Sequence, residues 1–363
     1  MSKIAGIGIA VPPYKMQQGE IHRFMEKVYD AGDDDKRKLK MLYERSGIAT
    51  RYSVVPDYNE DLNTRMLFPD TGNLEPFPSL EKRMELYHRY AGTLAVEAIN
   101  KLRQCATVND VTHLITVSCT GLSAPGLDLE LMERLGLPNH IQRSAVNFMG
   151  CYAAVHALKQ ADAICNSSAA AKVLIVSVEL CTLHFQKKTD YDNLTANAIF
   201  GDGAAACLVV SDDTETGSGN AVHIKGFYSE VHHSAKKDMA WQLSSSGFLM
   251  TLSSYIPQLV ESNIEQLVTN AMDRLHLSKH DIAHWAIHPG GRKILEAISG
   301  KLALEPSALQ YSYEVLNEYG NMSSATLLFV LKKMIETDTV QGTIFGAAFG
   351  PGLTMETVVL DKH

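Results

Sequence analysis

The sequence predicts an α/β fold, because apolar runs typical of buried strands alternate with helical patterns along the chain. Residues 114–117, 173–178 and 205–210 are short and apolar, as expected of buried strands. Between the first two runs, Ala153, Ala157, Ala161 and Ile164 recur at helical spacing. A strand, a helix and a second strand in this order are typical of a layered α/β protein.

The two halves of the chain end in similar patterns, which predicts an internal duplication. Residues 199–210 and 344–360 each start with apolar residues, pass through a Gly-rich bend and finish in a β-prone run. Residues 211–220 contain no large apolar side chain and predict a loop between the halves. We therefore expect an N-terminal half over residues 1–215 and a C-terminal half over residues 216–363.

The composition is that of an ordinary globular protein. The 363 residues are 45% hydrophobic and 20% charged, enough for a sizeable core. A net charge of −8 argues against a duplex nucleic-acid partner. No apolar run reaches the roughly 18 residues of a membrane span, so we expect no membrane insertion. The chain begins without an apolar signal segment, which predicts a cytoplasmic protein.

Cys151 is the most distinctive of the six cysteines. None of the six has the spacing of a metal site, so we expect no metal. Cys151 follows Gly150 and opens a helical pattern over residues 152–165. A thiol at a helix N-terminus feels the positive end of the helix dipole, which predicts a lowered pKa. Cys119 and Cys181 follow apolar runs and are candidates for lining a pocket.

His288 and Asn321 are the other candidates for chemistry. His288 ends a short apolar run and is followed by Pro289, two glycines and a predicted helix over residues 293–298. This places an imidazole at the carboxyl end of a strand, where α/β proteins keep their sites. Asn321 precedes a helix rich in Leu and Phe, where Asn also serves as a cap. We expect all three side chains at strand-to-helix junctions.

A thiol, an imidazole and an amide can together perform acyl transfer with decarboxylation. The imidazole takes the thiol proton, giving a thiolate–imidazolium pair. His288 and Asn321 can then donate hydrogen bonds to a thioester carbonyl as it becomes an enolate. This suits loss of carbon dioxide from a malonyl thioester and attack of the carbanion on an acyl group carried by Cys151. The same residue types also serve proteolysis, so they do not decide between the two.

The sequence resembles the type III polyketide synthases, the chalcone synthase-like branch of the thiolase superfamily. The resemblance covers almost the whole chain and rests on five short motifs in order. They are Gly150-Cys151-Tyr152-Ala153, Phe200-Gly201-Asp202-Gly203-Ala204-Ala205, His288-Pro289-Gly290-Gly291, Gly320-Asn321-Met322-Ser323-Ser324-Ala325 and Phe349-Gly350-Pro351-Gly352. In the last, Gly350, Pro351 and Gly352 also predict a rigid turn with close backbone approach.

The resemblance implies a five-layer αβαβα fold, a homodimer and coenzyme A (CoA) thioester substrates. It makes Cys151 the acyl-carrying nucleophile, with His288 and Asn321 as partners and no bound metal or organic cofactor. It makes Phe200 a gate between a CoA tunnel and an internal cavity. The resemblance also implies that Lys38 and Arg45 bind the phosphates of CoA. These lie in residues 33–45, whose acidic-to-basic order predicts a solvated helix.

Several positions depart from the plant members of the family. A third basic position for CoA is Met41 here, and Arg292 is the candidate that compensates. Cys119, Cys181 and His184 stand where plant enzymes carry Thr. Trp241 replaces a cavity Gly, Met250 a Phe, and Ala124 a Met that reaches into the partner subunit. The resemblance implies that the chain belongs to a bacterial-type branch and that the substrate gate and cavity are formed by Phe200, Cys119, Cys181, His184, Trp241, Met250 and Ser323.

We expect a synthase that extends an acyl-CoA starter with malonyl-CoA and cyclises the chain to a pyrone or a resorcinol- or phloroglucinol-type product. A single-condensation β-ketoacyl-acyl carrier protein synthase III is the nearest alternative, since it also uses Cys, His and Asn. A papain-like hydrolase and an inactive thiolase-like dimer are more distant ones. The starter and the number of extensions depend on cavity shape, which side-chain identities do not set.

Overall fold

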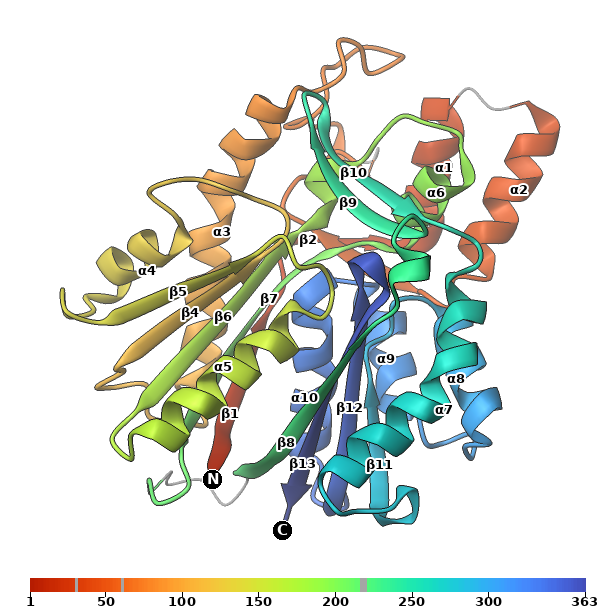
Figure 1. Ribbon diagram of the computed structural model, residues 1–363. Coiled ribbons are helices and arrows are strands. Elements are labelled where there is room, and N and C mark those ends of the chain that lie inside the picture. Colours follow the sequence, from red (N-terminus) through yellow and green to blue (C-terminus); the bar gives the residue numbers. More distant parts are fainter. Residues whose placement is uncertain (30–31, 60–61, 216–220) are drawn as a thin grey trace.

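A nine-stranded mixed sheet forms the centre of the protein (Figure 1). The computed structural model describes residues 1–29, 32–59, 62–215 and 221–363. The order of the strands in this sheet is β11-β12-β13-β8-β1-β7-β6-β4-β5. Their bounds are β1 Ser2–Ala10, β4 His113–Ser118, β5 Gln142–Asn147, β6 Lys172–Leu180, β7 Asp202–Ser211, β8 Val222–Val231, β11 Ile282–Ile287, β12 Gly342–Gly350 and β13 Thr354–Lys362.

Two small hairpin-like sheets and the helices complete the described chain. The small sheets pair β2 (Tyr14–Gln17) with β3 (Thr50–Ser53) and β9 (Met239–Ser244) with β10 (Gly247–Leu252). The α-helices are α1 Gln18–Tyr29, α2 Asp33–Glu44, α3 Leu80–Leu102, α4 Leu127–Leu135, α5 Ala153–Ser167, α6 Tyr191–Ile199, α7 Ile256–Arg274, α8 Arg292–Leu302, α9 Gln310–Tyr319 and α10 Thr326–Ile335.

The two halves of the sheet repeat one topology. In the first half, β4 is parallel to β6, β6 antiparallel to β7, and β7 antiparallel to β1. In the second, β11 is parallel to β12, β12 antiparallel to β13, and β13 antiparallel to β8. The halves join where residues 2–4 of β1 pair with residues 222–224 of β8. This repeat agrees with an internal duplication.

The helices cover the half-sheets in layers, so the expected α/β class is confirmed. Helix α3 packs on β1, β6 and β7, and α7 packs on β8 and on α8. Helices α5 and α10 each contact strands of both half-sheets and form the middle layer (Figure 1). Both carry buried apolar residues around most of their surface, which is expected of a helix covered on two sides.

The predicted elements lie where the patterns placed them. Residues 114–117, 173–178 and 205–210 lie in β4, β6 and β7, and the alanine-rich pattern is α5. Residues 33–44 form α2, as expected for the acidic-to-basic segment. The predicted loop over residues 211–220 begins at the last residue of β7, and its residues 216–220, with the boundary between the halves, lie outside the described residues.

The proposed similarity of residues 199–210 and 344–360 is wrong in local structure. Residues 344–350 belong to β12, which turns directly into β13 through a 3-10 turn at Pro351–Leu353. The matching antiparallel strands β6 and β7 are instead separated by the 3-10 helix η2 (Cys181–His184) and by α6. Ile199 and Phe200 therefore end a helix, because the first half carries an insertion at this point.

Helix α3 packs closely against β1 at Gly8. A Cβ at Gly8 would lie 2.1 Å from Leu102 N and 2.2 Å from Ala98 O. Contacts this short are with backbone, so no rotamer change relieves them. Gly8 is therefore what allows the outer helix to pack on the centre of the sheet.

We expect Gly8→Ala to lower stability by at least about 1–3 kcal/mol, the usual cost of overpacking. Thermal and urea unfolding measure this. The control is Gly300→Ala at an exposed position of α8, where a Cβ meets nothing within 4 Å. There the higher helix propensity of Ala should raise stability by about 1 kcal/mol. Equal effects of the two variants would contradict the packing argument.

Candidate active site

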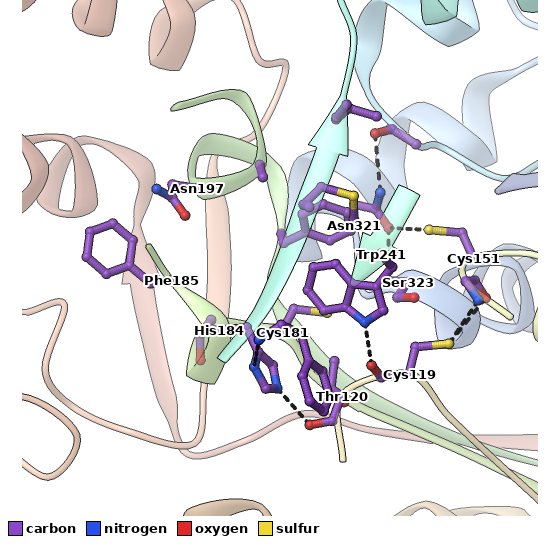
Figure 2. Close-up of a pocket in the computed structure, with 18 of the residues that line it drawn as sticks. Cys119, Thr120, Cys151, Cys181, His184, Phe185, Asn197, Trp241, Asn321 and Ser323 are labelled. Carbon is purple, nitrogen blue, oxygen red and sulfur yellow. Dashed lines mark hydrogen bonds between the residues drawn. The ribbon is translucent and has the colours of Figure 1, made fainter. Parts of the chain in front are cut away.

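Cys151 lies in a tight turn between β5 and α5. Gly150 has φ +84°, and a Cβ there would lie 2.2 Å from Cδ of Pro351, so only glycine fits. The Gly150 N–H points at the Cys119 sulfur, with N and Sγ 3.0 Å apart. The turn that presents the Cys151 thiol thus packs against Pro351 and is hydrogen-bonded to Cys119, which Figure 2 shows beside Cys151.

His288 directly follows β11, as the sequence predicted. Its backbone N–H donates to Ala347 O at 2.8 Å, which continues the β11–β12 pairing to the histidine. The side chain is 1% exposed, and neither ring nitrogen has a hydrogen-bond partner among the described residues. Both ring nitrogens are therefore free of hydrogen bonds to the described residues and can bond to a molecule that enters the pocket.

Asn321 corrects the expectation of three strand-to-helix junctions, since it follows α9 rather than a strand. Its side-chain oxygen accepts from Ser323 N–H at 2.9 Å and lies 4.0 Å from the Cys151 sulfur. Its Nδ2 donates to Gly290 O at 3.2 Å. An amide nitrogen has two hydrogens, so one remains to donate into the pocket. Figure 2 shows Asn321 directed toward Cys151.

One pocket is lined by the three side chains that the sequence predicted to be reactive and by every predicted cavity residue. The insertion between β6 and β7 contributes three of these cavity residues, and the β9–β10 hairpin contributes Trp241 and Met250, which are cross-strand neighbours. The lining residues among the predictions are Cys119, Cys151, Cys181, His184, Phe200, Trp241, Met250, His288, Asn321, Ser323 and Pro351. Segments from both halves therefore form a single cavity.

A second, more basic pocket adjoins the first, and Leu252, Gly290 and Ile294 line both. The three predicted CoA-binding residues, Lys38, Arg45 and Arg292, line this second pocket. Met41 and Lys293 also line it. Lys38 pairs with Asp35 at 3.0 Å and Arg292 with Glu296 at 2.7 Å, both on exposed surface.

The C-terminal glycines allow the close approach that the sequence predicted. A Cβ at Gly350 would lie 2.6 Å from Cδ1 of Tyr152 and 3.4 Å from the Cys151 N atom. Gly352 has φ +77°, a conformation that favours glycine. This turn therefore packs directly against the start of α5.

Comparison with known proteins identifies the family. Models of the N-terminal and C-terminal domains of chalcone and stilbene synthases match residues 1–213 and 228–362. The chain belongs to the chalcone and stilbene synthase family. It is a polyketide synthase acyltransferase, and this family and fold exclude the papain-like hydrolase.

Solved type III polyketide synthase structures superpose on the whole chain. The type III domain of Steely1, a type I/III hybrid from Dictyostelium, is 26% identical with a TM-score of 0.91 and 99% of each chain covered. PKS-I from the brown alga Ectocarpus siliculosus is also 26% identical, with a TM-score of 0.91, covering 100% of this chain and 98% of its own. A mutant of CsyB, at 24% identity and a TM-score of 0.87 with both chains fully covered, shows the fold alone. The bacterial-type branch stays a prediction.

Burial shifts the pKa values of Cys151 and His288, and for the thiol the shift is opposite to the lowered pKa predicted from the sequence. Desolvation raises the pKa of the Cys151 thiol to about 12, although hydrogen bonds with Ser323 and Asn321 act in the opposite direction. Desolvation also lowers the pKa of His288 to about 3. Loss of water therefore favours the neutral form of both groups.

His184 is a structural element of the cavity wall. Its Nε2 is 2.7 Å from Thr120 O, and its Nδ1 accepts from Phe248 N–H at 3.2 Å. Its ring stacks on Phe248 with centroids 4.2 Å apart. Burial lowers the pKa of His184 to about 3, so it stays neutral. Trp241 Nε1–H donates to Cys119 O at 2.7 Å and closes the same wall.

Glu179 is a site residue that the sequence reasoning missed. It is fully buried behind the pocket and accepts from Cys119 N at 3.0 Å, from Thr120 Oγ1 at 2.9 Å and from Ser324 Oγ. Burial raises its pKa to about 7. A lone acidic residue near the end of the apolar run over residues 173–180 was the available signal.

Two further findings concern the described residues as a whole. No group of three or more His, Cys, Asp or Glu side chains in residues 1–29, 32–59, 62–215 and 221–363 could hold a metal ion. None of the helices described is long and apolar enough to cross a membrane.

The raised pKa of Cys151 predicts slow alkylation of the free enzyme at neutral pH. Only the thiolate reacts, and below the thiol pKa its fraction rises about tenfold per pH unit. We expect iodoacetamide labelling of Cys151, followed by peptide mass spectrometry from pH 6 to 9, to accelerate throughout this range. Cys151→Ser provides the background from the other cysteines. A rate that is already at its plateau at pH 6 would instead show a thiolate–imidazolium pair.

Proposed function

We propose that this synthase loads an acyl-CoA starter on Cys151, extends it with malonyl-CoA and cyclises the product to a pyrone or a resorcinol- or phloroglucinol-type ring. One observation carries the proposal. Cys151, His288 and Asn321 come from three distant segments and line one pocket, which adjoins a second pocket lined by Lys38, Arg45, Arg292 and Lys293. An acyl-CoA has the same two-part arrangement, because its pantetheine arm joins the reactive thioester at one end to the phosphates at the other.

Loading transfers the acyl group from one sulfur to another. His288, neutral at rest, takes the Cys151 proton as the sulfur attacks the thioester carbonyl. The carbon–sulfur bond of the starter then breaks, and the leaving CoA thiolate takes the proton back from His288. Moving the proton from Cys151 to His288 places two opposite charges side by side in the pocket. This costs less free energy than ionising either buried group alone.

Extension breaks the bond between the malonyl carboxylate and the α-carbon, with release of carbon dioxide. The electron pair passes to the thioester carbonyl, whose developing negative oxygen accepts hydrogen bonds from His288 and from the second Nδ2 hydrogen of Asn321. The carbanion attacks the acyl carbon on Cys151, and the cysteine sulfur leaves. No step uses a metal or a bound organic cofactor, and we propose that none is required.

Further proposals concern the oligomeric state, the location and the partners of the protein. A homodimer is proposed because β5 lies at the edge of the sheet with most of its residues exposed, so its free edge can pair with a second copy. Cytoplasmic location and absence of a nucleic-acid partner stay predictions from the sequence.

We expect purified enzyme to convert malonyl-CoA and acyl-CoA starters, from acetyl to long-chain and aromatic, into pyrones or resorcinols detected by mass spectrometry. Cys151→Ala should abolish product because no acyl carrier remains. His288→Ala and Asn321→Ala should each slow carbon dioxide release by about a hundredfold or more, as for a lost oxyanion donor. Product from Cys151→Ala would contradict the nucleophile. A single condensation with carrier-protein thioesters preferred would favour the β-ketoacyl synthase alternative.

The basic pocket predicts that charge on α2 supports CoA binding. Arg45→Gln and Lys38→Gln should raise KM for CoA thioesters several-fold and leave kcat nearly unchanged, because the phosphates lie far from the reacting carbon. Added salt should reduce the difference from wild type, since it screens exposed charges. Lys36→Gln is the matched control, because Lys36 is exposed on the same helix and does not line the pocket. Equal effects at positions 36 and 38 would contradict the assignment.

A further inference from the structure

A buried arginine, Arg51 on β3, contacts the segment that connects the gate to the catalytic amide. Arg51 is 3% exposed and lines the catalytic pocket. Its Nη1 donates to Phe200 O at 2.5 Å and to Asn197 O at 2.9 Å. Its Nε donates to the side-chain oxygen of Gln18 at 2.9 Å. All three acceptors are neutral, and two of them are backbone carbonyls at the C-terminal end of α6.

The last carbonyls of α6 show what Arg51 does there. Carbonyls at a helix C-terminus lack intrahelical partners and carry partial negative charge. Here Asn197 and Phe200 are satisfied by Arg51, Ala198 by Gln18 Nε2 at 2.7 Å, and Ile199 by the backbone N–H of Asn321 at 2.9 Å. Each terminal carbonyl of α6 thus has a partner, and Arg51 supplies half of them.

The same segment is bonded to the catalytic amide. Phe200 and Asn321 form a short parallel bridge, in which Gly201 N–H donates to Asn321 O at 3.0 Å. Arg51 packs beneath this bridge, because a Cβ at Gly320 would lie 2.9 Å from Arg51 Cδ and 2.8 Å from Ile199 O. Gly320 has φ +70°, so the residue before Asn321 is suited to this close approach.

We propose that Arg51 is a positioning residue that holds the Phe200–Asn321 bridge and so sets the amide of Asn321 opposite Cys151. Arg51 acts through the bridge and takes no part in bond breaking. The inference rests on the proposed function, in which Asn321 serves decarboxylation and Cys151 with His288 serves loading. Loss of Arg51 should therefore slow extension more than loading. A general loss of structure would slow both.

Two half-reactions test this split. Loading is followed as the acyl adduct on Cys151 by intact mass, and extension as carbon dioxide released from malonyl-CoA by loaded enzyme. For Arg51→Met we expect loading within about threefold of wild type, and extension slower by about tenfold to a hundredfold, the cost of a small misplacement. Arg51→Lys keeps a cationic donor for the Phe200 carbonyl and should recover part of the extension rate.

Arg83→Met is the matched control. Arg83 is fully buried and likewise donates to backbone carbonyls, those of Pro78 and Leu183, but does not contact α6 through any of these bonds. Its loss should lower the melting temperature and change both half-reactions in parallel. If Arg51→Met fails to fold, Gln18→Leu removes the partner of Arg51 Nε and of Ala198 O, and should show a smaller split of the same sign.

Hydrogen exchange gives a readout without turnover. Loss of Arg51 should speed exchange at the amides of Gly201 and Asn321 relative to the sheet core, since these two N–H groups form the bridge. Equal slowing of loading and extension, or unchanged exchange at both amides, would overturn the role of Arg51. Failure of wild-type enzyme to load and extend any thioester would instead overturn the proposed function.

Discussion

The burial of α5 and α10 between two half-sheets is the constraint on which the rest of the structure depends. Both helices are apolar around most of their surface, so each needs cover on two sides. The two half-sheets with their repeated topology provide it, and the helices then begin at the same edge as the carboxyl ends of the parallel strands. Cys151 precedes α5, Asn321 precedes α10 and His288 directly follows β11, so three residues distant in the chain meet there.

The same packing decides the chemistry of the pocket. Removing water raises the cost of any isolated charge, which keeps the Cys151 thiol and the His288 imidazole neutral. It also leaves the nitrogens of His288 without partners in the described chain. A thioester carbonyl would supply the missing acceptor, and its negative charge in the transition state would interact with fixed donors more strongly than in water.

Segments outside the repeated core line much of the pocket. The insertion between β6 and β7 carries Cys181, His184 and Phe200, and it has no counterpart between β12 and β13. The β9–β10 hairpin adds Trp241 and Met250. The duplicated core thus positions the reactive residues, whereas segments added to it shape the cavity. Function in such folds commonly lies in sites added to a shared scaffold.

Several secondary-structure elements and the candidate reactive residues could be predicted from the sequence alone. The runs over residues 114–117 and 173–178, the helical alanines of α5, and the order of Cys151, His288 and Asn321 with their glycines were determined by the sequence, because strand, helix and turn preferences are set by near neighbours. The tertiary structure decided the rest. Cys151 gained a raised pKa in place of a lowered one, Asn321 followed a helix, and Glu179 and Arg51 became parts of the site. Desolvation and hydrogen bonds between segments 60 to 149 residues apart depend on atoms that no local pattern contains, and these set the properties of the pocket.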